Sequence, residues 1–144
     1  MNLDDEIKLL IADLSNPPEI IDEWEPIADF LSDTFEWAGS KIDWGKTINH
    51  SYHKLTSNKG VWPALVIAFI NKHDLVCNSK EIFYINDSSL DFALRISAEQ
   101  FNSTLILLIN NVPQHQYFFD TEAKWCLSIT SEGYVDFGFS NMTK

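Results

Sequence analysis

The amino-acid sequence predicts an α+β fold in which N-terminal helices pack on an antiparallel sheet formed mainly by the C-terminal half. Apolar residues recur at helical spacing in residues 3–14 and 27–37, whereas short apolar runs bounded by turn residues follow from residue 82 onward. Helices first and strands later are typical of α+β folds rather than of alternating βαβ units. Because the chain has 144 residues, no repeat and no long linker, we expect residues 1–144 to form a single domain.

Two helices are expected in the first 40 residues. Residues 3–14 place leucine and isoleucine at steps of three and four, which indicates an amphipathic helix, and the SNPP sequence at 15–18 ends it. A second helix restarts near Pro26, because proline is tolerated in a first turn, and Gly39 is its expected C-cap. The expected apolar face of this second helix consists of Ile27, Phe30, Leu31, Thr34 and Trp37.

The middle of the chain is less regular. Residues 40–60 have no clean periodicity, which predicts a long loop with at most one helical turn. Residues 61–72 are apolar and compatible with either a helix or a buried strand. The shared face of Trp62, Val66 and Phe69 favours a helix, with Pro63 in its first turn.

The second half of the chain predicts most of the sheet. Strands are expected at 82–85 and 92–96, and the SAEQ sequence at 97–100 resembles a capping box before a helix that Pro113 ends. The segments QYFFD, WCLSIT and YVDFGFS then predict a three-stranded meander with turns at 120–123 and 131–133. Strand alternation places about half of the aromatic residues of this tail in the core.

The charge of the chain restricts its partners. A net charge of −11 argues against nucleic acids and anionic membranes as partners and is compatible with a basic protein. Residues 1–45 contain twelve acidic residues and two lysines, whereas residues 46–80 contain five lysines and one acidic residue. The acidic N-terminus does not resemble a signal peptide, and no apolar run approaches the length of a membrane span, so we expect a cytoplasmic protein.

The sequence contains no catalytic or metal-binding signature. It has no G-x-S-x-G, H-E-x-x-H, P-loop or G-x-G-x-x-G motif, so we expect neither an enzyme nor a cofactor. His50 and His53 have the spacing of a helical metal pair, but no third ligand accompanies them, and a role in a surface loop is the expected one. Cys77 and Cys126 are expected to be buried free thiols.

One acidic segment stands out, DEWEPIADFLSDTFEW at residues 22–37, which has six acidic residues and no Lys or Arg. On a helix, five of its carboxylates would follow one face at steps of three and four, opposite the apolar face. Like charges at these spacings repel, so the stripe is either ordinary solvated surface or a face for a cationic partner. The five residues are Asp22, Glu25, Asp29, Asp33 and Glu36.

A small, acidic α+β chain without catalytic motifs, ending in WCLSITSEGYVDFGFS, resembles bacterial immunity proteins of contact-dependent growth inhibition and related polymorphic toxin systems. The resemblance implies a protein that binds and neutralises the toxic domain of a cognate effector, often a nuclease. A nuclease has a basic substrate groove, which an acidic helix could block by imitating phosphate charge.

The leading hypothesis is therefore a non-enzymatic immunity protein that binds a basic toxin domain and occludes its active site. The acidic stripe is expected to supply the electrostatic attraction, and Trp37, Trp44 and Tyr52 are expected to add aromatic anchors. Two alternatives remain open. One is a small acidic regulatory or adaptor domain with another basic protein partner, and the other is an enzyme of unrecognised type.

Overall fold

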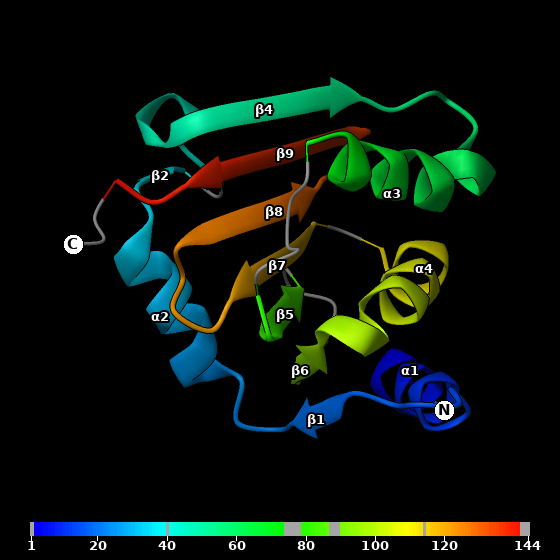
Figure 1. Ribbon diagram of the computed structural model, residues 1–144. Coiled ribbons are helices and arrows are strands. Elements are labelled where there is room, and N and C mark those ends of the chain that lie inside the picture. The colour runs from blue at the N-terminus through cyan, green and yellow to red at the C-terminus, as the bar shows by residue number, and fades with distance from the viewer. Residues whose placement is uncertain (1, 40, 74–78, 87–89, 114, 142–144) are drawn as a thin grey trace.

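The computed structural model describes residues 2–39, 41–73, 79–86, 90–113 and 115–141. These residues form an antiparallel seven-stranded sheet with helices on both faces, which confirms the predicted α+β class. Figure 1 shows three layers: α1, α3 and α4 cover one face of the sheet, and α2 and the short strand β2 lie on the other. We call these the helix-covered face and the second face. The helices are α1 (Leu3–Ala12), α2 (Glu25–Thr34), α3 (Trp62–Lys72) and α4 (Phe101–Asn111).

The sheet has the strand order β1-β6-β5-β7-β8-β9-β4, and every pairing in it is antiparallel. The C-terminal half supplies the five central strands, while the N-terminal half supplies both edges. A separate two-stranded ladder pairs β2 with β3. The strands are β1 (Glu19–Ile21), β2 (Trp37–Ala38), β3 (Lys41–Ile42), β4 (Ile48–Lys54), β5 (Glu81–Asn86), β6 (Ala93–Ser97), β7 (Gln116–Asp120), β8 (Trp125–Ile129) and β9 (Tyr134–Phe139).

Local sequence explains where the helices begin. The side chain of Asn2 caps α1 by accepting a hydrogen bond from the amide of Asp5. The predicted capping box precedes α4: Ser97 and Gln100 exchange side-chain and backbone hydrogen bonds around the 3₁₀ turn η3 (Ala98–Gln100). Two further 3₁₀ turns, η1 (Trp44–Lys46) and η2 (Lys59–Val61), lie on either side of β4. The helix predicted at 61–72 is confirmed as α3, with Pro63 in its first turn.

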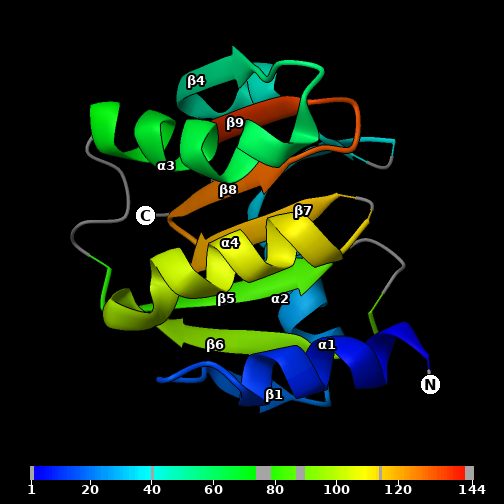
Figure 2. The ribbon, with the colours of Figure 1, turned by 90° about the vertical axis from the view of Figure 1, so that its right-hand side faces the viewer.

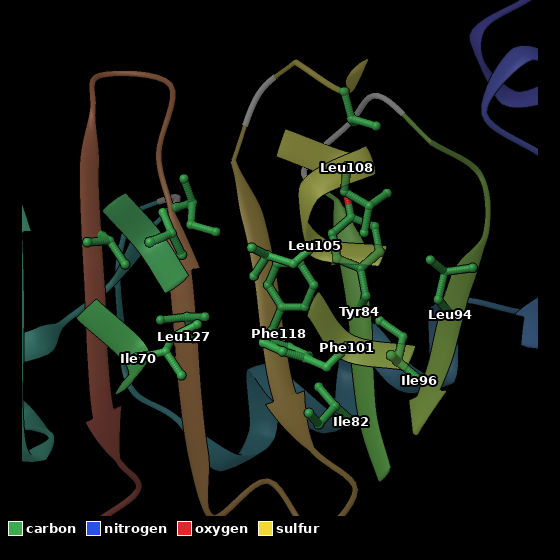
Figure 3. Packing of buried hydrophobic residues seen from close by; sticks show 14 of the residues in the cluster. Ile70, Ile82, Tyr84, Leu94, Ile96, Phe101, Leu105, Leu108, Phe118 and Leu127 are labelled. Carbon is green, nitrogen blue, oxygen red and sulfur yellow. The ribbon is translucent and has the colours of Figure 1, made fainter. Parts of the chain in front are cut away.

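The larger of two hydrophobic cores fills the space between the sheet and the helix-covered face. Figure 2 shows α1, α3 and α4 lying side by side over this face. In Figure 3, Leu105 and Phe101 of α4 meet Phe118 and Tyr84 of the central strands. All four side chains are at most 3% exposed, and the Phe101 and Phe118 rings meet edge to face with centroids 5.5 Å apart. This core packs α1, α3 and α4 against the sheet.

A smaller core lies on the second face, between the sheet and α2. Leu31 of α2 and Phe35 just after it are buried against Phe119 of β7, and Ile42 of β3 belongs to the same cluster. The free thiol of Cys126 is buried here, as predicted, and Cys77 lies outside the described residues. This core is the one that fixes α2 and the β2–β3 ladder over the sheet.

The structure corrects three predictions. Residues 40–60 are not a long loop, because their described part forms β3, η1 and the seven-residue edge strand β4. Helix α2 ends at Thr34, and Trp37 belongs to strand β2 because its backbone pairs with Ile42. Gly39 is not a helix cap, and its positive φ of 68° turns the chain after β2 instead.

Candidate partner-binding face

The acidic stripe is shorter than the sequence predicts. Only Glu25, Asp29 and Asp33 lie on α2, where they occupy the exposed face of the helix at steps of four. Among the described residues, none of these three carboxylates has an ion-pair partner. We call these three residues the acidic helix face. Their mutual repulsion is unrelieved within the described chain.

The two ends of the predicted stripe lie outside the helix and are neutralised from elsewhere. Asp22 precedes α2, and its Oδ1 atom accepts a hydrogen bond from Lys8 Nζ of α1 at 3.0 Å. Glu36 follows α2, with its Oε1 atom 3.8 Å from Lys46 Nζ of η1. The prediction of one helical stripe of five carboxylates is therefore wrong, because the backbone is helical only over Glu25–Thr34.

An aromatic ring lies beside the acidic helix face. Phe30 is predicted on the buried side of the helix, but its side chain is 37% exposed, while Leu31 is fully buried. Successive residues of a helix are about 100° apart around its axis. Phe30 therefore points to the side of α2 between the exposed side of Asp33 and the buried side of Leu31. The exposed surface of α2 thus combines three carboxylates, which have no ion-pair partner within the described ranges, with one apolar ring.

The predicted anchor Trp37 is half-buried and packs on the sheet. Its ring packs on Tyr117 of β7 with centroids 5.7 Å apart, and the residue is half-buried against the smaller core. The indole nitrogen Nε1 is itself shielded from solvent and has no hydrogen-bond partner among the described residues. Trp37 therefore holds β2 against the sheet.

The other two predicted anchors, Trp44 and Tyr52, belong to one aromatic stack. The ring of His50 lies between them, 5.3 Å from Trp44 and 5.6 Å from Tyr52, with interplanar angles of 12° and 22°. Tyr52 is the outermost member and is 64% exposed. Residues from η1 and from β4 are thus brought together into a single exposed surface feature.

Close packing on β9 holds the inner end of this stack. A Cβ atom on Gly138 would lie 2.6 Å from Thr47 Oγ1 and 3.2 Å from Trp44 Cε3, so only glycine leaves room for these two side chains. Thr47 Oγ1 also donates a 2.7 Å hydrogen bond to the carbonyl oxygen of Trp44. Gly138 therefore allows the chain around η1 to lie directly on the sheet.

A largely buried carboxylate lies beneath the stack. Asp136 of β9 is 13% exposed, and its Oδ1 atom lies 2.8 Å from His50 Nε2. An ionised carboxylate only accepts hydrogen bonds, so His50 is then the donor. Burial raises the pKa of the Asp136 carboxyl, although the hydrogen bond and the charge of His50 act in the opposite direction.

A small pocket opens next to this carboxylate. Strand pairing places Asp136 opposite Ser128, and Ser128 opposite Tyr117, so the three side chains form a row across β9, β8 and β7. The cavity above this row has a volume of about 100 Å³. Its lining includes Lys41, Trp44, Tyr117, Ser128, Tyr134 and Asp136.

The two histidines of the predicted pair lie on opposite faces of the sheet. His50 bonds Asp136 on the second face, whereas His53 pairs with Val135, whose side chain belongs to the core of the helix-covered face. They cannot share a metal ion. Across the described ranges, no group of three or more His, Cys, Asp or Glu side chains is placed to hold one. In the same ranges, no helix combines the length and apolarity needed to cross a bilayer.

Sequence reasoning missed the pocket residues Asp136, Ser128 and Tyr134 as a group. A signal was present: in WCLSIT and YVDFGFS, the residues that alternate with the apolar ones are Cys126, Ser128, Asp136 and Gly138. Pairing the two strands through a three-residue turn would have placed them on one face. The comparison with known proteins adds no family assignment, since no protein-family model and no curated protein matches this chain.

Proposed function

We propose that this chain is a non-enzymatic immunity protein of a bacterial toxin system, which acts in the cytoplasm by binding a basic toxin domain and occluding its active site. The observation that carries the proposal is the acidic helix face, where Glu25, Asp29 and Asp33 are exposed beside the exposed ring of Phe30 and have no ion-pair partner in the described part of the chain. A cationic partner turns the repulsion among these carboxylates into attraction and accelerates association.

The aromatic stack on the same side of the sheet gives the proposed interface a second element. Tyrosine and tryptophan are enriched among the residues that dominate binding energy. Tyr52 presents most of its side chain to solvent while His50 and Trp44 support it from within. The ring is therefore ordered before binding, which reduces the entropy lost on association.

Co-expression with the product of the gene immediately upstream tests the proposal, because immunity genes lie directly downstream of toxin genes. We expect copurification of the two proteins and rescue of growth. Copurification without rescue would favour the regulatory or adaptor alternative. If the two proteins did not copurify and growth was not rescued, the proposal would be overturned.

A pair of charge-reversal variants tests the acidic helix face itself. The double substitution D29K/D33K is expected to slow association with the toxin domain by at least about tenfold at low salt and to reduce its salt dependence. The matched control is D13K/E99K, which changes the net charge by the same amount on the opposite side of the sheet, at the end of α1 and in η3. Equal effects of the two variants would show that net charge, not this face, drives association.

The enzyme alternative has one observation in its favour, namely the His50–Asp136 pair beside a pocket. The arrangement differs from a Ser-His-Asp triad, in which histidine stands between the hydroxyl and the carboxylate. Here Asp136 is paired across the strands with Ser128, and aromatic rings flank His50 on both sides. The volume of about 100 Å³ is also smaller than the roughly 300–1,000 Å³ typical of ligand sites.

A further inference from the structure

We propose that the pocket beside Asp136 binds the guanidinium group of an arginine side chain. The inference rests on the proposed function for the identity of the protein that carries this arginine, namely the basic partner. The argument for the pocket itself depends on its walls, its carboxylate, its net charge and its size.

The walls are aromatic on several sides. Trp44, Tyr117 and Tyr134 all line the cavity, and they come from η1, β7 and β9. Aromatic faces attract cations through the quadrupole of the ring, and the planar guanidinium also stacks on them. An ammonium group is more strongly hydrated than a guanidinium, so it loses more on entering such a partly dry site. The walls therefore favour arginine over lysine.

The floor provides a carboxylate that is already withdrawn from water. Asp136 is 13% exposed, and among the described residues its side chain has one hydrogen-bond partner, His50, at 2.8 Å. A carboxylate accepts about four hydrogen bonds, so Asp136 has acceptor capacity left. Burial disfavours its charge, and a cation entering the pocket would offset that penalty.

The other charged groups around the pocket do not cancel this attraction. Lys41 lines the cavity, but its Nζ atom lies 3.0 Å from Glu132 Oε1. Together, Lys41, Glu132 and Asp136 carry one net negative charge when His50 is neutral. The cavity of about 100 Å³ suits the end of a side chain rather than a whole metabolite.

The pocket is tested with a probe that needs no toxin domain. The peptide acetyl-Gly-Arg-Gly-amide is titrated into the ¹⁵N-labelled protein, with the citrulline peptide as its uncharged isostere. We expect saturable shifts of the Trp44 indole and of the Ser128 and Tyr134 amides, with a dissociation constant on the order of millimolar, as for a fragment-sized ligand. The citrulline peptide should bind at least about tenfold more weakly.

Three variants locate the binding. D136N should abolish the preference for arginine over citrulline, and Y134L should weaken the arginine peptide severalfold while keeping the carboxylate. E99Q, in η3 away from the pocket, should bind the arginine peptide as the wild type does. If D136N does not fold, Y134L and the comparison with the citrulline peptide still test whether the pocket binds the guanidinium group.

Two outcomes would overturn the proposal. One is equal binding of the arginine and citrulline peptides, and the other is an arginine response unchanged in both D136N and Y134L. These outcomes are independent of the proposed function, which fails separately if the upstream protein neither copurifies nor is neutralised. If the pocket binds the peptide but the protein binds no toxin, the arginine site is supported and the toxin is excluded as its partner.

Discussion

The imidazole of His50 and the carboxylate of Asp136 meet at 2.8 Å across the pairing of β4 with β9. His50 comes from an edge strand that the sequence does not reveal, and Asp136 comes from the last strand of the sheet. The contact joins the exposed aromatic stack to the polar row beneath it. It makes the stability of the second face sensitive to pH.

The substitution His50→Ala is expected to lower the free energy of unfolding by about 1–3 kcal/mol at pH 7, because the largely buried carboxylate of Asp136 loses its hydrogen-bond partner. The loss should shrink as the pH falls. The pKa of Asp136 is raised in the folded state, so this state binds the proton more tightly than the unfolded chain does. As the pH falls, Asp136 is therefore protonated above the ordinary carboxyl pKa. The neutral carboxyl no longer carries the charge that His50 stabilises, so less is lost when His50 is removed.

Urea unfolding at pH 7 and at about pH 4.5, just above the ordinary carboxyl range, measures this difference. The variant His53→Ala is the matched control, because His53 lies on the opposite face of the same strand. We expect its effect to change less between the two pH values. An equal loss of stability in His50→Ala at both pH values would contradict the role of Asp136.

The substitution Asp29→Lys should stabilise the free protein while weakening partner binding. Asp29 stands four residues from both Glu25 and Asp33 on α2, so a lysine there replaces two repulsive pairs by two attractive ones. The expected gain is about 1 kcal/mol or less at low salt, and it should decrease as salt is added. Thermal unfolding at two ionic strengths measures it. Asp29→Asn, which only removes repulsion, should give about half the gain, and a destabilised Asp29→Lys would contradict the assignment of an unrelieved acidic face.

The substitution Gly138→Ala should destabilise the protein by about 1–3 kcal/mol through overpacking. The added Cβ would lie 2.6 Å from Thr47 Oγ1 and 2.9 Å from Thr47 Cβ. The double variant Thr47→Ala/Gly138→Ala should lose less stability than the sum of the single variants, because the clash partner is gone. Gly45→Ala is the control, since its Cβ would meet only Asp43 Oδ1, at 3.4 Å. Additive effects in the double variant would show that the clash is not the cause.

The thiol of Cys126 should be unreactive in the folded protein. The side chain is fully buried, and burial raises the pKa of the thiol well above its usual range, so little thiolate forms. In a Cys77→Ser background, Ellman's reagent should modify Cys126 only after the protein is unfolded in urea. Rapid modification under native conditions would mean that the smaller core opens locally.

The predicted helices succeed where one face of a segment is buried and the other is not, as in α1, α3 and α4, which are all confirmed. The meander β7–β9 is confirmed for another reason: β7 and β8 are buried on both faces, and short apolar runs between turn residues reveal them. Strand β4 was missed because nearly every residue of INHSYHK is exposed, which leaves no alternation to read. For α2, helical spacing continues by coincidence to Trp37, where pairing with Ile42 determines the backbone instead.

The candidate site was predictable only where it is local in sequence. Glu25, Asp29 and Asp33 follow one another on a helix, so their spacing indicated a common face. The pocket could not be recognised in this way, because Trp44, Tyr117 and Asp136 come from three distant segments that only the sheet order brings together. Strand order and register are set by tertiary packing, which one sequence does not display.

The strand order also has a consequence for the way the protein is synthesised. Both edge strands, β1 and β4, leave the ribosome before the strands that they pair with, β6 and β9. Such long-range pairings form slowly, because closing a large loop costs chain entropy before the new contacts stabilise the chain. A nascent chain that has reached only α3 therefore holds both edges of a sheet without its centre. Since β9 carries Asp136 and Gly138, the aromatic stack gains its support, and the pocket its floor, only when the last strand has emerged.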